Sequence, residues 1–267
     1  MSRVPVMLSV AGSDPSGGAG IQADLKTATA LGVYGAAAIT SLTAQNTTGV
    51  SGIFAVPGSF VADQYEAVVS DLDVQAVKIG MLGTADVVVA LVDAMRRRPV
   101  RYVVLDPVMV ATSGDRLVAE DTVEAIRERL LPITTLLTPN LPETATLLGW
   151  PEPRDLDEMV DAAAALRELG AGAALVKGGH LTGTTSDDVL VDAEGPAQFT
   201  STRVVTENTH GTGCTLSSAI ASLLLRPLPL RPAIQEAKTY LTGALRGGAG
   251  RHLGAGSGPV DHLWESR

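Results

Sequence analysis

Four consecutive residues, Gly211 to Cys214, form the strongest chemical motif in this chain of 267 residues. Two glycines, Gly211 and Gly213, lead into the only cysteine, and an apolar run typical of a helix follows at once. The first N–H groups of a helix have no partner within the helix, and its dipole favours negative charge there. The motif therefore predicts an anion site that suits a phosphate group.

The position of Cys214 at the start of this helix also bears on its chemistry. Thiolates are favoured at helix N-termini, so we expect the Cys214 thiolate to be favoured and to serve as a base or polar partner for a substrate hydroxyl. The alternative is a small, buried, apolar cysteine, which is a common fate of free thiols.

Carboxylates and a lysine follow other apolar runs. Asp106 ends the run VVLD, and Glu143 stands three residues after Asn140, which ends TLLTPN. Two carboxylates at neighbouring strand ends suit Mg²⁺, which binds oxygen ligands and water. The alternatives are a strand-end turn for Asp106 and a first-turn helix charge for Glu143. Lys177 precedes two glycines after a buried run, where a lysine can point at phosphate.

The glycine-rich turn AGSDPSGGAG, residues 11–20, allows the backbone to approach a ligand closely. It is neither a Walker A loop nor a dinucleotide fingerprint. Taken alone, Asp24 reads as a free surface carboxylate. Gln45 reads as a polar turn residue, although its amide suits the edge of a heterocycle. The four histidines show no metal-ligand spacing, so we expect no zinc site.

The overall composition excludes several protein classes. A net charge of −9 argues against a nucleic-acid binder, although a local positive site can still bind an anionic substrate. With 45% hydrophobic and 18% charged residues, the chain is expected to be soluble and globular. A single cysteine favours a cytoplasmic location. We expect neither a signal peptide nor a membrane span, because no apolar run approaches about 20 residues.

Strands and helices are expected to alternate and so to position these residues. Strands are expected at 4–12, 34–44, 74–82, 101–109, 134–140 and 171–179, with a loop and a further strand within 46–57 and an edge hairpin over 186–195 and 196–205. Helices are expected at 21–32, 59–72, 84–98, 119–132, 141–149, 155–170, 210–225 and 233–250, with a connector at 225–232 and a less ordered tail after 250. Such units predict one α/β domain, residues 1–267, with a mostly parallel sheet whose strands present ligand-binding residues at their carboxyl ends.

Seven motifs in order resemble one family over about residues 4–250. They are AGSDPSGGAGIQADLKT, TSLTAQNT, VKIGML, LDPVM, LTPNLPE, VKGGH and NTHGTGCTLSSA. Together they are similar to the hydroxymethylpyrimidine/phosphomethylpyrimidine kinases of thiamine biosynthesis, in the ribokinase-like superfamily. The resemblance implies a three-layer α/β/α fold and a homodimer. It also implies ATP- and Mg²⁺-dependent phosphorylation of a pyrimidine alcohol and then of its monophosphate.

The resemblance also implies roles for individual residues. The pyrimidine site would contain Gly12, Asp24, Gln45 and Met81. The anion hole would consist of Gly211, Thr212, Gly213 and Cys214, with Cys214 where many relatives have a catalytic Asp. Asp106 and Glu143 would serve Mg²⁺ through water, and Asn140, Lys177, Thr209 and Lys238 would lie near the nucleotide phosphates. We hypothesise that a thiol, unlike a carboxylate, repels a phosphorylated substrate little, so one site accepts both substrates.

Three other functions remain open on the sequence. A pyridoxal kinase of the same superfamily would share the phosphate site. A thiol enzyme would use Cys214 as nucleophile and would need a histidine, such as His210, beside it. A non-catalytic binding module would bind the pyrimidine without turnover.

Overall fold

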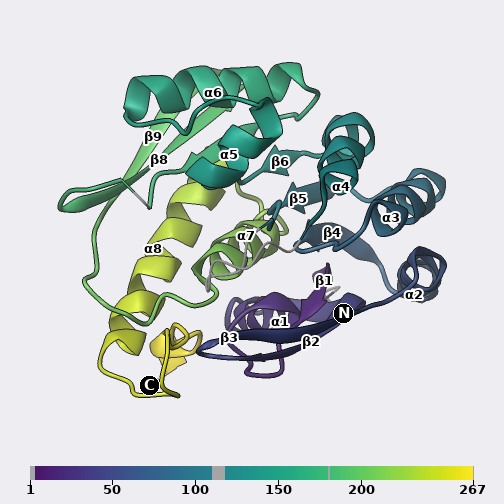
Figure 1. The fold of residues 1–267 in the computed structure, drawn as a ribbon, viewed down its shortest axis with the longest axis horizontal. Helices are drawn as coiled ribbons and strands as arrows, with labels where there is room; N and C mark the ends of the chain where they lie inside the picture. Colours follow the sequence, from purple (N-terminus) through teal and green to yellow (C-terminus); the bar gives the residue numbers. More distant parts are fainter. Residues whose placement is uncertain (1–3, 110–117, 180, 267) are drawn as a thin grey trace.

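A computed structural model describes residues 4–109, 118–179 and 181–266. Within these residues nine strands form one sheet, in the order β3-β2-β1-β4-β5-β6-β7-β8-β9 (Figure 1). The pairs from β2 through β7 are parallel, whereas β3, β8 and β9 pair antiparallel with their neighbours. The strands are β1 (Val6–Ser13), β2 (Tyr34–Asn46), β3 (Gly49–Ala55), β4 (Val74–Ile79), β5 (Tyr102–Leu105), β6 (Leu136–Leu137), β7 (Ala174–Lys177), β8 (Thr185–Asp192) and β9 (Gly195–Thr202).

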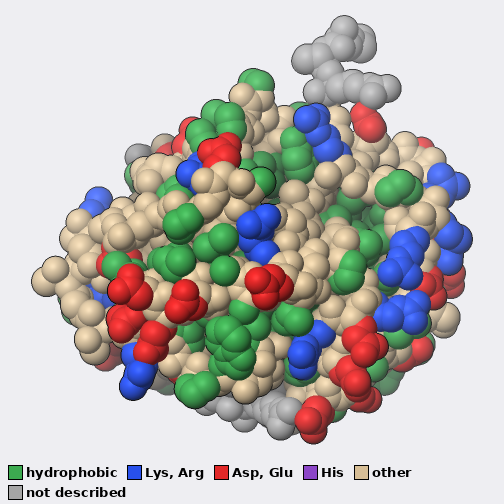
Figure 2. Space-filling model, turned by 90° about the horizontal axis from the view of Figure 1, so that it is seen from above, with side chains coloured by type: hydrophobic (Ala, Val, Ile, Leu, Met, Phe, Trp, Pro, Cys, Tyr) green, Lys and Arg blue, Asp and Glu red, His purple; other side chains and the backbone are tan. Residues whose placement is uncertain are grey.

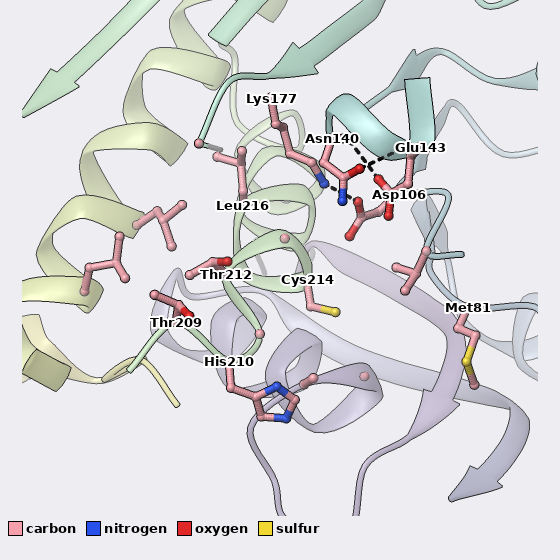
Figure 3. Close-up of a pocket in the computed structure, with 18 of the residues that line it drawn as sticks. Met81, Asp106, Asn140, Glu143, Lys177, Thr209, His210, Thr212, Cys214 and Leu216 are labelled. Atoms are coloured by element: carbon pink, nitrogen blue, oxygen red, sulfur yellow. Dashed lines mark hydrogen bonds and ion pairs between the residues drawn. The ribbon is translucent and has the colours of Figure 1, made fainter. Parts of the chain in front are cut away.

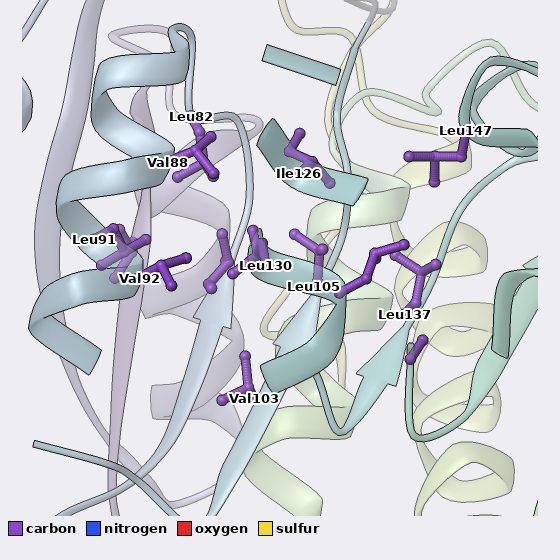
Figure 4. Packing of buried hydrophobic residues seen from close by; sticks show 14 of the residues in the cluster. Leu82, Val88, Leu91, Val92, Val103, Leu105, Ile126, Leu130, Leu137 and Leu147 are labelled. Atoms are coloured by element: carbon purple, nitrogen blue, oxygen red, sulfur yellow. The ribbon is translucent and has the colours of Figure 1, made fainter. Parts of the chain in front are cut away.

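Helices cover both faces of the sheet, because successive strand residues point to opposite sides. Leu8 and Val77 belong to a core shared with one helical layer, whereas their neighbours Met7 and Ala76 belong to the core on the other face. The first layer contains α2 (Gly58–Asp71), α3 (Ala85–Arg97), α4 (Glu120–Ala125), α5 (Leu141–Leu148) and α6 (Leu156–Glu168); the second contains α1 (Gly20–Ala30), α7 (Thr212–Leu223) and α8 (Leu230–Ala249). Figure 4 shows the first core, where leucine and valine side chains of α3 meet those of the strands. The expected three-layer α/β/α fold with an edge hairpin is confirmed.

Several expected boundaries are wrong. The strand expected at 134–140 is the two-residue β6, and the helix expected at 119–132 is α4 followed by a π turn, Ile126–Leu130, and a 3₁₀ turn, Leu131–Ile133. Helix α8 begins at Leu230, inside the expected connector, with Pro229 at its N-cap. Pro232 lies in the first turn, where the N–H group that proline lacks would have no partner within the helix.

The tail after residue 250 also departs from the expectation of lower order. Gly256 N–H donates to Thr47 Oγ1 over 3.1 Å, at the turn between β2 and β3. Gly258 N–H donates to Asn208 Oδ1, and its carbonyl accepts from His210 N–H. The segment 256–262 therefore packs along the loop that enters α7.

The topology places the residues of interest at one edge. The chain runs from β1 to β2 on one side and later returns to β4 on the other side, so the switch point lies beside β1. The carboxyl ends of β1, β4, β5, β6 and β7 open toward the start of α7 (Figure 1). This is where ligands bind in open α/β sheets.

The surface carries charges of both signs. On the face drawn in Figure 2, acidic and basic side chains are interspersed with apolar ones. Among the described residues, no helix is long and apolar enough to cross a bilayer.

Candidate active site

A cavity of about 640 Å³ lies at the carboxyl ends of the strands (Figure 3). It is lined by every residue that the sequence singled out for the site except Asp24. Its walls come from the turns after β1, β4, β5, β6 and β7, from the start of α7 and from α8. Residues distant in the sequence are thus brought to one chamber, and their individual contacts determine what it can do.

The glycine turn before α7 is shaped for an anion. Gly211 is the N-cap of α7 with φ 80° and ψ 11°, a left-handed conformation that favours glycine. A Cβ atom at Gly211 would also overlap the carbonyl of Gly18. Helix α7 starts at Thr212, so the amides of its first turn lack partners within the helix. The residues of this turn line the cavity. This geometry is that of an anion site at a helix N-terminus.

Sequence reasoning missed Asp14, which fixes the glycine-rich turn against the anion site. Its carboxylate accepts from the N–H groups of Ser16 (2.8 Å), Gly18 (3.1 Å) and Ala19 (2.9 Å), and lies 2.8 Å from His210 Nε2. Burial opposes ionisation, but these bonds, that of His210 foremost, hold the pKa of Asp14 at about 2. The Asp-Pro-Ser-Gly-Gly spacing, typical of an Asx-turn, could have identified it.

The Cys214 thiol is not activated as expected. Burial raises its pKa to about 11, although Lys78 and the Gly20 N–H act in the opposite direction. Desolvation outweighs the helix terminus, so the thiol is neutral near pH 7. His210 points away from the Cys214 sulfur and toward Asp14 (Figure 3). A covalent thiol mechanism therefore lacks both its thiolate and its base.

An ion pair stands beside the first turn of α7. Lys177 Nζ donates to Asp106 Oδ1 over 2.6 Å, and both side chains are largely buried (Figure 3). Burial works against the charge on Lys177, but Asp106 and Glu143 together raise its pKa above the usual range. A Cβ atom on Gly213 would lie 3.3 Å from both Lys177 Nζ and Asp106 Oδ2, so only glycine leaves this space open.

Glu143 closes the same corner through a capping box at the start of α5. Its carboxylate accepts from Asn140 N–H over 2.8 Å, and the Asn140 side chain accepts from Glu143 N–H over 2.8 Å. Burial raises the pKa of Glu143 to about 7, with Lys177 opposing and Asp106 adding to the rise. The carboxyl is thus poised to ionise when positive charge arrives.

These two carboxylates fit a hydrated magnesium ion. Within the described residues no group of three histidine, cysteine, aspartate or glutamate side chains could enclose a metal. Mg²⁺ commonly binds through one or two carboxylates plus waters and substrate phosphates, so such an enclosure is not needed. Asp106 raises the pKa of Glu143, so a cation held by both carboxylates would favour ionisation of Glu143.

Lys238 lines the cavity but is already paired. Its ammonium lies 2.5 Å from Asp188 Oδ2, and both residues are buried. The other oxygen, Asp188 Oδ1, accepts from Gly178 N–H over 3.0 Å. The pair joins α8 to the turn that follows Lys177. Thr209, on the opposite side of the anion turn, is exposed within the cavity mouth.

The opposite end of the chamber is less charged. Met81 lies so close to Gly12 that a Cβ there would come within 2.6 Å of Met81 Cε. Thr40 Oγ1 fixes the Met81 carbonyl at 2.6 Å, and Gln45 Oε1 accepts from Thr43 over 3.1 Å. An apolar side chain opposite an amide is suited to a small heterocycle with polar edges.

Asp24 lines no part of this cavity, contrary to the role implied for it. Its side chain is completely buried, so it is not a free surface carboxylate either. It accepts hydrogen bonds from Ser9, Lys78 and Ser218, which occupy β1, β4 and α7. A carboxylate with three such donors is held inside the fold, behind the cavity lining.

Comparison with known proteins gives a consistent result. The profile described as phosphomethylpyrimidine kinase matches residues 14–261. Hydroxymethylpyrimidine/phosphomethylpyrimidine kinase of Escherichia coli K12 is 49% identical over 256 residues, covering 96% of both chains. The thiamine biosynthesis bifunctional protein ThiED of Geobacter sulfurreducens is 51% identical over 96% of this chain and 52% of its own length. The ADP complex of Bacillus subtilis pyridoxal kinase has a TM-score of 0.91 at 34% identity, covering 99% of both chains.

Proposed function

Because the chain belongs to the phosphomethylpyrimidine kinase family, we propose that it transfers phosphoryl groups from ATP to hydroxymethylpyrimidine and then to its monophosphate. The observation that carries this function is the match over residues 14–261. The structure supports it with an anion turn placed between an ion pair and a less charged pocket in one cavity. Both ends of a transfer reaction thus have a place in the chamber.

The residues of the chamber divide the work of an in-line transfer. Gly12, Gln45 and Met81 hold the pyrimidine with its hydroxymethyl group toward Cys214. The amides of Gly213 and Cys214 receive the transferred phosphoryl group and stabilise its equatorial oxygens. Such a reaction needs positioning and charge neutralisation more than covalent chemistry.

Lys177 stands where it can bind the transferred phosphate, since its Nζ would lie 3.3 Å from a Cβ on Gly213. To do so it shares its ammonium with Asp106, or exchanges that partner for phosphate. Asp106 and Glu143 would hold Mg²⁺ through water, and the ion would neutralise charge on the nucleotide phosphates. Asn140 and Thr209 would lie near those phosphates, and Lys238 would orient the turn after Lys177 through Asp188.

A neutral Cys214 explains how one chamber can serve two substrates. With its pKa near 11, the thiol carries no charge that would repel a substrate phosphate. An aspartate in its place would add a negative charge beside the monophosphate. We therefore expect Cys214→Asp to lower the second phosphorylation more than the first, and equal losses in both steps would contradict this role.

The decisive experiment follows ADP release by purified protein with Mg-ATP. Hydroxymethylpyrimidine, its monophosphate and pyridoxal are compared as acceptors. Turnover of both pyrimidines with poor use of pyridoxal supports the proposal. Pyridoxal as the best acceptor would favour the alternative suggested by the structural likeness to pyridoxal kinases. Absence of turnover with every acceptor would leave a binding module.

We also propose that the chain acts as a single domain in a cytoplasmic homodimer. The hairpin of β2 and β3 supports the dimer, because Leu42 and Phe54, which pair across it, are 48% and 68% exposed, and Ile53 on its other face is 48% exposed. Exposed apolar side chains at a sheet edge favour association with a second copy.

A further inference from the structure

A buried ion pair is hydrogen-bonded to helix α7 and lies outside the cavity lining. Lys78 on β4 and Asp24 on α1 are both 0% exposed, and Lys78 Nζ lies 2.9 Å from each carboxylate oxygen. Neither residue lines the chamber, so neither touches a substrate. The pair can therefore influence a reaction in the cavity only through the residues that separate it from the cavity.

The pair is joined to helix α7 by short hydrogen bonds. Asp24 Oδ1 accepts from Ser218 Oγ over 2.5 Å, and Ser218 lies one turn after Cys214. Asp24 Oδ2 accepts from Ser9 Oγ of β1 over 2.6 Å. One carboxylate therefore ties α7 to β1 and β4 just behind the helix terminus that forms the anion hole.

Both members of the pair act electrostatically on the Cys214 thiol. Among the charges that act on the Cys214 thiol, Lys78 has the largest influence, ahead of Asp24 and Asp106. The Lys78 ammonium thus lowers the pKa of the thiol more than the Asp24 carboxylate raises it. Positive charge in a desolvated site stabilises negative charge nearby far better than it would in water.

Stability alone does not explain such a pair. Removing two charges from water is expensive, and apolar residues of similar volume are often as stabilising or more so. Asp24 and Lys78 nevertheless occupy the interior, and the hydroxyls of Ser9 and Ser218 each donate a hydrogen bond to the Asp24 carboxylate. A role in the reaction accounts for their place.

We propose that Lys78 and Asp24 are positioning residues that act on the anion site from behind. Asp24 fixes the start of α7 through Ser218, so that the amides of the anion hole keep their direction. Lys78 supplies positive charge behind Cys214, where the acceptor oxygen would lie. This role in the reaction rests on the proposed kinase function, whereas the effect of Lys78 on the Cys214 thiol does not depend on it.

The test uses a double variant, Lys78→Met with Asp24→Asn, which removes both charges and preserves volume. Since Cys214 is the only cysteine, mass spectrometry of iodoacetamide-treated protein follows this thiol alone. At pH 8 we expect alkylation to slow by about threefold or more, because less thiolate is present. A mere loosening of the structure would expose the thiol and accelerate alkylation, which is the opposite sign.

Kinetics give the second readout. We expect kcat of the double variant to fall about tenfold while KM for ATP stays within about twofold, as for a group that acts in the transition state. Ser218→Ala, a small change, should lower kcat in the same direction even if the double variant folds poorly. Unchanged kcat in both variants, or alkylation as fast as in the wild type, would overturn the proposal.

A matched control separates this effect from the general loss of an ion pair. Arg231 and Asp192 form a pair at 2.7 Å between α8 and β8, outside the cavity. Arg231→Met with Asp192→Asn should leave the alkylation rate and kcat unchanged. If the wild-type protein has no kinase activity, the proposed function fails, whereas the alkylation difference still tests the influence of Lys78.

Discussion

Replacing Glu143 with glutamine should stabilise the free protein at alkaline pH and destabilise it at acid pH. The pKa of this carboxyl is about 7 in the folded state, against 4.5 for a glutamate in the unfolded chain. A raised carboxyl pKa means that stability is fully present below pH 4.5 and is lost as the pH rises through 7. At about 1.4 kcal/mol per pKa unit, the difference between 4.5 and about 7 is worth about 3.5 kcal/mol in full, of which about 3 kcal/mol is reached at pH 8, where the folded-state carboxyl is not yet completely ionised.

The glutamine variant removes the loss of stability at high pH, because it cannot ionise, but it loses a hydrogen bond. The wild-type carboxylate accepts from the N–H groups of Asn140 and Met109, whereas an amide presents one acceptor oxygen only. One lost hydrogen bond costs about 1 kcal/mol. The net change is a gain of about 2 kcal/mol at pH 8 and a loss of about 1 kcal/mol at pH 4, where the wild-type carboxyl is neutral in both states.

Thermal melts without metal at both pH values measure this reversal. At about 2 °C per kcal/mol for a chain of this size, Glu143→Gln should raise Tm by roughly 4 °C at pH 8 and lower it by roughly 2 °C at pH 4. Glu152→Gln, at an exposed position, serves as control and should leave the pH dependence unchanged. A variant that is less stable by the same amount at both pH values would refute the reasoning.

The same variant tests the proposed metal role. Losing one of two carboxylates should raise the Mg²⁺ concentration needed for half-maximal turnover and lower kcat. Unchanged magnesium dependence would remove Glu143 from that role while leaving the stability argument intact.

Three further changes test other parts of the structure. Gly213→Val fills the space beside Asp106 and Lys177 and should lower ADP release by at least about 100-fold with a near-normal melt; ordinary turnover would exclude the anion site there. His262 has a pKa of about 4 because it is buried, so stability falls between pH 6.5 and 4 as the unfolded state gains protons. His262→Gln should remove up to about 3 kcal/mol of that fall, measured by urea denaturation at pH 7 and 4.5, and an unaltered fall would contradict it. Phe54→Asp should convert the proposed dimer to monomer in light scattering, and a persisting dimer would place the interface elsewhere.

The sequence predicts the fold because the strand residues alternate between two cores. Met7 and Leu8 are both apolar, so a run that is apolar throughout indicates a strand covered on both faces. The predicted ends of strands and helices are wrong where tertiary packing, and not the local sequence, determines where an element stops. The run TTLLTPN looks like a full strand, but only Leu136 and Leu137 pair with β5, because the chain turns into the capping box of Asn140 immediately afterwards.

The site is predicted less evenly. Residues at strand ends reach the cavity because topology brings strand ends together. The state of Cys214 could not be predicted, because helix position favours the thiolate and only the three-dimensional structure shows that burial prevails. Lys78 lies inside the apolar run VKIGML, and its partner Asp24 is 54 residues away, so nothing local indicates a buried pair.

The tail that packs along the loop before α7 determines when the chamber can form during synthesis. Chains leave the ribosome from the N-terminus, and residues that have not emerged cannot pair. The contact between Asp14 and His210 spans 196 positions, and that between Thr47 and Gly256 spans 209. The turns at Asp14 and Thr47 can therefore make these contacts only after residues about 200 positions further along the chain have emerged. A chain that ends before these residues lacks the contacts that hold the glycine-rich turn and the loop before α7 in place, so we expect its phosphate site to be unfinished.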